Sequence, residues 1–267
     1  MNNLVVISCW FGQRFQKPNK KKSIPQLVAY MKYLIKSLIP SKLYSFFQVQ
    51  SVVPLAPKNC DKAIFFTNNK SLKKEIISKG WKYSFIKNDT LSGIESVASS
   101  LIAKKVKFLQ LDQHILNELY SFEYVLYVDS RAIVDDINQI KSMCDKGIVI
   151  KYSPAHKNKN SIWDEVEEAK GQERYALSMP ETIKFIERKI KNSEYTHKNR
   201  VMATGVILYK LGDQKYKDRI LSLCHEVYSS CMELNQPECQ IIWCLLSQRY
   251  NDFITKVEAE DILTRSI

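Results

Sequence analysis

Short apolar runs ending in polar turns recur along this chain, and polar segments separate them. Runs that are rich in β-branched and aromatic residues and end in a turn are typical of buried strands. We predict six strands from such runs, at residues 4–9, 63–67, 81–86, 123–129, 147–152 and 205–209.

Between these runs, apolar residues recur at helical spacing. This spacing predicts helices at residues 25–40, 71–79, 101–120 (one helix or a pair), 161–176, 181–191, 216–233 and 239–248. Gly80 is expected to end the second of them as a C-terminal cap. Strands that alternate with helices over the first half predict an α/β fold with a mainly parallel central sheet flanked by helices. No linker and no internal repeat interrupts residues 1–267, so we expect a single domain.

The net charge of the chain limits the classes of molecule that we expect it to bind. Lys and Arg number 40 and Asp and Glu 28, a formal net charge of +12. This excess suits nucleic acid, an anionic membrane face or phosphorylated small molecules, although a solvated lysine-rich surface gives the same count. Aromatic residues do not interleave with basic ones as in an RNA-binding sheet, which disfavours a nucleic-acid-binding protein.

The cysteine pattern and the hydropathy of the chain indicate the cellular compartment in which we expect the protein. The seven cysteines form no Cys-x-x-Cys pair, which favours reduced thiols in a cytoplasmic protein. No apolar stretch reaches the roughly 18 residues of a membrane-spanning helix. In the helix at 25–40, Lys32 and Lys36 lie opposite the apolar face. That pattern fits peripheral contact with an anionic membrane, but a helix covering a sheet is the favoured interpretation.

The strongest strand ends directly before Asp129. Ligands of open α/β sheets bind beyond the carboxyl ends of strands, where a carboxylate binds a ribose or a divalent metal. An acid that merely caps the next turn would look the same. Lys104 and Lys107 lie one helical turn apart before this strand, so both amines can face the phosphates of a sugar nucleotide. A solvated helix face is the alternative for the lysine pair.

Further candidates lie in the second half. Ser161 is expected to cap a helix with Asp164 at its third position, and Glu165 follows. Glu165 could bind an acceptor hydroxyl or act as general base, as could Glu238 before the apolar helix at 239–248. Both could equally be first-turn acids that answer the helix dipole. Gly205, at the predicted start of a strand, would permit close approach of the backbone to a ligand.

The order of these segments resembles the TOD1/MUCI70 glycosyltransferase-like domain family of plant and microbial polysaccharide enzymes. The matching pieces are Phe11-Gly12, Phe66-Thr67-Asn68, Gly80-Trp81, Ala103-Lys104 with Lys107, Val128-Asp129-Ser130-Arg131, His156 with Lys159 and Ile162 to Glu165, Thr204-Gly205 and Gln240. The chain departs from the family pattern at three positions. Asn68 replaces an acid, Lys159 replaces Arg, and Cys239 stands where the family has the acid of an Asp-Gln pair.

The resemblance implies a GT-A-type (Rossmann-like) glycosyltransferase that moves a sugar from a nucleoside-diphosphate sugar to a glycan or other carbohydrate acceptor. Such enzymes serve polysaccharide or glycoprotein glycan synthesis. Residues 1–135 would bind the nucleotide sugar and residues 136–267 the acceptor. The implied catalytic residues are Asp129, Glu165 and Glu238. The implied substrate-binding residues are Phe11, Gly12, Thr67, Asn68, Lys104, Lys107, Arg131, His156, Thr204, Gly205 and Gln240.

The metal and the competing functions stay open. Metal-dependent GT-A sites carry Asp-x-Asp, and here Arg131 takes the place of the second acid. Mn2+ or Mg2+ would therefore be held by Asp129 with other groups, or be absent. A nucleotidyl- or phosphotransferase should show a glycine-rich phosphate loop after the first strand, and Phe11-Gly12-Gln13 is not one. A non-catalytic family member that acts as a partner subunit is the remaining alternative, beside the disfavoured nucleic-acid-binding protein.

Overall fold

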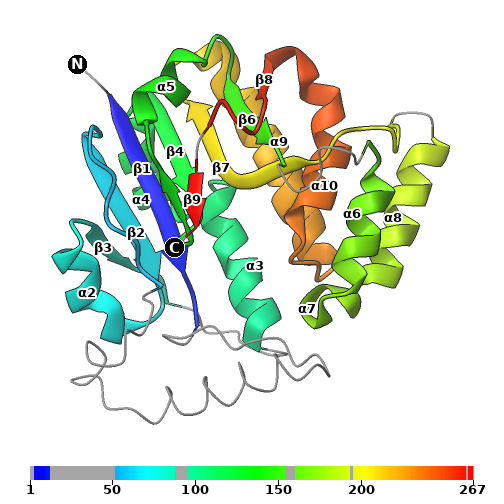
Figure 1. Cartoon of the computed structure of the whole chain (residues 1–267), viewed down its shortest axis with the longest axis horizontal. Helices are drawn as coiled ribbons and strands as arrows, with labels where there is room; N and C mark the ends of the chain where they lie inside the picture. Colours follow the sequence, from blue (N-terminus) through cyan, green and yellow to red (C-terminus); the bar gives the residue numbers. More distant parts are fainter. Residues whose placement is uncertain are drawn as a thin grey trace.

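The computed structural model describes residues 3–12, 52–87, 95–153, 160–192, 195–262 and 264–266 (Figure 1). Its central sheet has seven strands in the order β3-β2-β1-β4-β7-β6-β8. These strands are β1 (Leu4–Trp10), β2 (Lys62–Thr67), β3 (Lys82–Phe85), β4 (Tyr124–Val128), β6 (Ile148–Tyr152), β7 (Met202–Lys210) and β8 (Ile254–Val257). All six predicted strands are present.

The sheet is mainly parallel, as predicted. Strands β3, β2, β1 and β4 pair in parallel, and so do β6 and β8. Strand β7 is the exception, because it runs antiparallel to both of its neighbours, β4 and β6. The predicted fold class, an α/β domain with a mainly parallel sheet flanked by helices, is confirmed.

Side-chain alternation along each strand builds one core on each face of the sheet. In β1, Val5 and Ile7 belong to the larger core, and Leu4 and Val6 belong to the smaller one. Helices α3 (Glu95–Lys107), α6 (Ile162–Lys170), α8 (Met179–Lys191), α9 (Gln214–Glu233) and α10 (Cys239–Leu246) pack into the larger core. Helices α2 (Lys73–Ser78) and α5 (Ile137–Ser142) cover the other face. Figure 1 shows α6 and α8 grouped on the side away from β1 to β3.

The helix predictions hold with shifted bounds. The segment predicted at 101–120 is a pair, α3 and α4 (Gln113–Tyr120), and α3 begins earlier, at Glu95. The segment predicted at 161–176 divides at Gly171 into α6 and α7 (Glu173–Ala176). Gly80 has a φ of +87°, the left-handed conformation expected of a residue that ends a helix. The helix predicted at 25–40 lies outside the described residues.

Strand β7 contains an irregularity where it passes the end of β4. Ile150 of β6 is paired with Ile207, but the next residue, Lys151, is paired with Ala203. Extra residues on one strand bend it and re-aim its side chains, a feature common beside functional sites. The prediction that the strand starts at Gly205 is therefore wrong, because β7 begins at Met202. Gly205 lies inside β7, within the irregular stretch.

The end of the chain packs beside the segment that follows Asp129. Strand β9 (Thr264–Ser266) pairs antiparallel with β5 (Ala132–Val134). The buried Lys151 amine donates a hydrogen bond to the carbonyl of Ile262 at 2.8 Å, which fixes the approach to β9. Among the described residues, no helix combines the length and apolar character needed to cross a membrane.

Candidate functional site

Asp129 occupies the carboxyl end of β4, where the sequence places it. Its backbone N–H donates to the carbonyl of Gly205 at 2.8 Å, so the last rung of the β4–β7 ladder fixes its position. Val125 and Tyr127 lie in the larger core, and Asp129 follows in the same alternation. Its side chain is therefore directed toward the face of the sheet that α3 covers.

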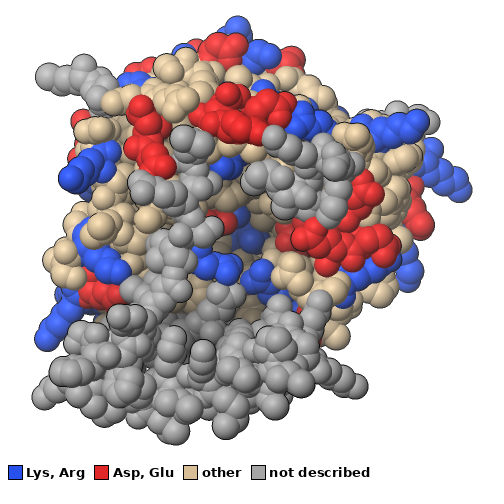
Figure 2. All heavy atoms as spheres, in the orientation of Figure 1, with Lys and Arg blue, Asp and Glu red and all other residues tan. Residues whose placement is uncertain are grey.

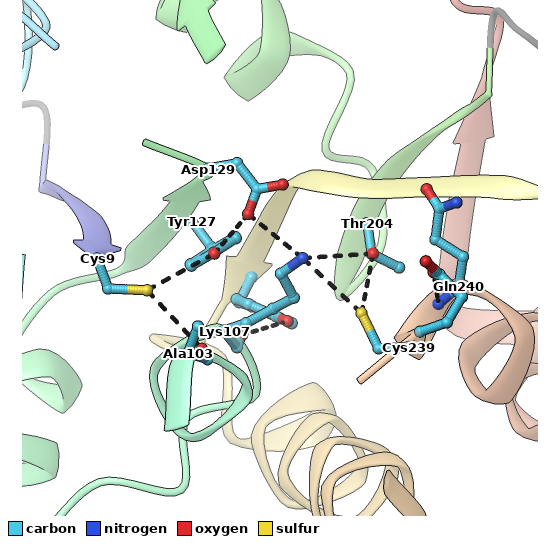
Figure 3. Close-up of polar contacts among 10 residues, drawn as sticks. Cys9, Ala103, Lys107, Tyr127, Asp129, Thr204, Cys239 and Gln240 are labelled. Carbon is cyan, nitrogen blue, oxygen red and sulfur yellow. Dashed lines mark hydrogen bonds and ion pairs between the residues drawn. The ribbon is translucent and has the colours of Figure 1, made fainter. Parts of the chain in front are cut away.

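Lys107, in the last turn of α3, meets Asp129 there (Figure 3). Its Nζ lies 3.4 Å from Asp129 Oδ1, 3.4 Å from Thr204 Oγ1 and 3.8 Å from Cys239 Sγ. The residue is only 3% exposed, and its ammonium lies 5.0 Å from the centre of the Tyr127 ring. Buried lysines are rare unless they are paired, and here one carboxylate is the charged partner.

Tyr127 holds the same carboxylate oxygen. Its hydroxyl donates to Asp129 Oδ1 at 2.6 Å. Burial, reinforced by the negative charge of Asp129, raises the pKa of Tyr127 well above its usual value, so the phenol keeps its proton and remains a donor. Oδ1 thus receives two donors, whereas Oδ2 has no hydrogen-bond partner among the described residues. Oδ2 faces Gly205, where a built Cβ would lie only 3.0 Å from it.

Charged side chains of both signs meet at this site. Burial alone would raise the pKa of Asp129, but Lys107, Lys104 and the Tyr127 hydrogen bond outweigh it and lower that pKa. The Asp129 side chain is 46% exposed, so water weakens the burial effect, and the two ammonium groups decide the direction. Burial lowers the pKa of the half-buried Lys104, and neighbouring groups that include Asp129 and Glu238 raise it by more. Figure 2 shows basic side chains inside a hollow on this face of the molecule.

The start of α10 and helix α6 bring a second group beside this one. Gln240 Nε2 donates to Glu165 Oε1 at 3.1 Å, and Glu165 is only 5% exposed. Figure 3 shows Thr204 and Cys239 both beside the amine of Lys107, with Gln240 further out on the same side. The structure therefore brings Glu165 and Gln240 to the same edge as Asp129, although they come from distant parts of the chain.

Glu238 has a structural task at this edge. Its Oε1 accepts a hydrogen bond from the backbone N–H of Gln240 at 3.0 Å, which caps α10. Glu238 is thus the N-terminal cap of α10, whereas the structural alternative was an acid within the first turn. Ser161 caps α6 as predicted, and with Asp164 at the third position it forms a reciprocal capping box. A catalytic role for Glu238 stays a prediction, on a carboxylate that already has a partner.

A hydrogen bond joins the loops that follow β1 and β2. The Gly12 N–H donates to Asn68 Oδ1 at 2.9 Å, and the Asn69 N–H donates to Thr67 Oγ1 at 3.0 Å. Phe11 and Thr67 are buried, and Gly12 has a φ of +100° that favours glycine. Contact of these residues with base and ribose stays a prediction, and the polar groups named here already pair with one another.

The remaining candidates are placed as follows. Arg131 is exposed on the turn after Asp129, and His156 lies outside the described residues. Among the residues that the structure describes, no group of three or more His, Cys, Asp or Glu side chains could hold a metal ion. Metal binding by Asp129 stays a prediction.

Two features of this site were not predicted from the sequence. They are the hydrogen bond of Tyr127 to Asp129 and the contact of Cys239 with Lys107. Tyr127 could have been found, since residues two apart on a strand share a face and Asp129 follows at that spacing. Cys239 lies 132 residues from Lys107 along the chain, and no local pattern reveals that contact.

Comparison with known proteins gives likeness in structure alone. No family model and no curated protein sequence matches the chain, so the resemblance to the TOD1/MUCI70-like domain stays a prediction. The structure is similar to mouse xyloside xylosyltransferase 1, with 10% identity and a TM-score of 0.40 over 94% of this chain and 84% of that one. It is also similar to the galactosyltransferase LgtC, solved with donor and acceptor sugar analogues, with 11% identity and a TM-score of 0.41 over 95% and 73%.

A third similar structure is the bifunctional glycosyltransferase WbbM, with 12% identity and a TM-score of 0.41 over 95% of this chain and 38% of that one. All three are glycosyltransferases. Likenesses at this identity and TM-score do not assign an activity, which has to be argued from the site itself.

Proposed function

We propose that this protein is a GT-A-type glycosyltransferase that moves a sugar from a nucleoside-diphosphate sugar to a carbohydrate acceptor. The observation that carries the proposal is the pair of buried and half-buried lysines, Lys107 and Lys104, around Asp129 at the carboxyl edge of the sheet. Ligands of open α/β sheets bind at this edge, and ammonium groups suit the negative charge of a diphosphate.

The chemistry assigns each group a task. In the transfer, the bond between the anomeric carbon and the diphosphate oxygen breaks, and the acceptor oxygen bonds to that carbon. Negative charge grows on the departing diphosphate, and fixed ammonium groups that are aimed at growing charge lower the barrier. Lys104 and Lys107 fill this role. Asp129 Oδ2, which faces Gly205, accepts a hydrogen bond from a hydroxyl of the donor.

The acceptor is proposed to bind beside α6 and α10. As the acceptor oxygen attacks, its proton must leave, and a carboxylate within hydrogen-bond reach can receive it. Glu165 is the stronger candidate base, since Glu238 is engaged in capping α10 whereas Glu165 is oriented by Gln240. The proposed setting is glycan or polysaccharide synthesis in the cytoplasm, with the protein in solution or at an anionic membrane surface.

A thermal-shift screen of sugar nucleotides tests the proposal. A ligand that binds the native state at 100 times its dissociation constant adds about 2.7 kcal/mol, which for a chain of this size raises Tm by about 5–10 °C. We expect one or two sugar nucleotides to give such a shift, and inorganic phosphate to give none. No shift with any sugar nucleotide would contradict the proposal.

Two matched variants localise the binding. Lys104→Met should abolish most of the shift, because it removes an ammonium beside Asp129. Lys105→Met is the control, since Lys105 lies on the same turn but pairs with Asp112 at 3.2 Å, away from the site. Release of nucleoside diphosphate from the stabilising donor, followed with a panel of sugar acceptors, then separates an enzyme from a non-catalytic binding subunit.

A further inference from the structure

The contacts of Asp129 indicate how the diphosphate of the donor binds. This inference rests on the proposed function. We infer that Lys107 and Lys104 bind the donor diphosphate directly, without a bridging divalent cation. Lys107 stands against the carboxylate oxygen at which such a cation would be expected.

The donor set around Asp129 does not suit a hard divalent cation. Mn2+ and Mg2+ take several oxygen ligands, commonly carboxylates, at short range. Here Asp129 belongs to no cluster of three acidic, His or Cys side chains among the described residues. Two positions further on, the chain has Arg131 instead of a second acid.

The oxygen itself is already occupied. Asp129 Oδ1 accepts the Tyr127 hydroxyl at 2.6 Å and lies 3.4 Å from the Lys107 ammonium. A divalent cation on Oδ1 would sit within a few ångströms of that ammonium. Two like charges at about 4 Å repel strongly wherever water is scarce. A cation on Oδ1 and the ammonium of Lys107 therefore exclude one another.

Neutral neighbours leave the charge of Lys107 available. Its other contacts are the hydroxyl of Thr204, the thiol of Cys239 and the face of the Tyr127 ring. An acid in place of Cys239 would add a second carboxylate beside this ammonium. With Cys239 there, the ion-pair partner of Lys107 among the described residues is Asp129, and the oxygens of a diphosphate can also accept from its ammonium.

Isothermal titration of the full chain with ADP, GDP, UDP and CDP tests this inference. Each is titrated twice, once with EDTA and once with Mn2+. We expect one nucleoside diphosphate to bind with the same dissociation constant in both conditions. In EDTA, Lys107→Met should weaken that binding at least about tenfold, which corresponds to about 1.4 kcal/mol. Lys105→Met, on the same helix turn, should leave it unchanged.

The outcomes separate this inference from the proposed function. Binding that requires Mn2+ would overturn the inference and leave the glycosyltransferase proposal standing. Undiminished binding by Lys107→Met in EDTA would overturn the part assigned to Lys107. Failure of all four diphosphates in both conditions would contradict the proposed function together with the inference. The wild-type titrations decide the role of metal even if Lys107→Met does not fold.

Discussion

Two groups of residues follow the carboxyl ends of strands in the same sheet. They differ in the partners of their polar side chains. In the loops that follow β1 and β2, Asn68 accepts a hydrogen bond from Gly12, and Thr67 accepts one from Asn69. At the end of β4, Asp129 pairs with Lys107 from α3, and Lys107 also contacts Thr204 in β7. The first group joins neighbouring strands with neutral groups. The second gathers charges from separate elements.

This difference teaches where function is to be sought. Neutral hydrogen bonds within a turn stabilise the turn itself. A buried ammonium with one partly exposed carboxylate adds little net stability, because desolvation offsets most of the attraction between them. Such a group is better explained by a ligand than by the fold. The loops that follow β1 and β2 and the group around Asp129 should therefore respond to mutation in opposite ways.

The largest expected effect in unfolding free energy comes from placing a methyl group against Asp129. A Cβ at Gly205 would lie 3.0 Å from Asp129 Oδ2, so Gly205→Ala should displace the carboxylate. In the Asp129→Ala background the obstacle is absent, and alanine should be as good as glycine or better in a strand interior. We expect a coupling of about 1–3 kcal/mol between the two substitutions, measured by urea unfolding of the four proteins.

Additive effects of the two substitutions would show that the close approach of Gly205 to Asp129 is not what restricts this position. Gly205→Ala should also weaken nucleoside-diphosphate binding, since it disturbs the carboxylate that Lys107 pairs with. This readout distinguishes a displaced Asp129 from general loosening of β7.

A smaller effect is expected in the loops that follow β1 and β2. Asn68→Ala removes the acceptor of the Gly12 N–H, and a lost hydrogen bond of this kind costs about 1 kcal/mol. Because Asn68 Oδ1 already accepts from Gly12, we expect nucleoside-diphosphate binding by the folded protein not to change, against the base and ribose contact that the family resemblance implies. Asn68→Asp keeps an acceptor and serves as the control. Loss of binding in Asn68→Ala without loss of stability would move the functional site toward β1 and β2.

Much of the fold could be predicted because the strands are short, apolar and bounded by turns. The runs that became β1, β2 and β4 are recognisable without tertiary information. The direction of β7 is not, since an apolar run looks the same in parallel and antiparallel pairing. The start of α3 was also missed, because the serine-rich segment Glu95–Ser100 has no apolar periodicity.

The site was predictable where local geometry determines it. Helical spacing places Lys104 and Lys107 on one side of α3, and strand alternation places Asp129 at the end of β4 facing that helix. The irregularity in β7 could not be predicted, since it depends on how β6 and β4 pair with the same strand. That irregularity positions Thr204 beside Lys107 and Gly205 beside Asp129.

The smallest expected effect is a pH dependence of the unfolding free energy that arises from Asp129 alone. The pKa of Asp129 lies below its ordinary value of 3.8 in the folded protein. A depressed pKa contributes stability that is complete above the ordinary value and is lost as the pH falls through the folded value. The unfolding free energies of wild type and Asp129→Asn should therefore differ by a constant amount near neutral pH and converge below pH 3.8. The convergence should stay within about 1 kcal/mol, because the side chain is half exposed and screened. Asn68→Ala changes no ionisable group, and its difference from wild type should be the same across this range.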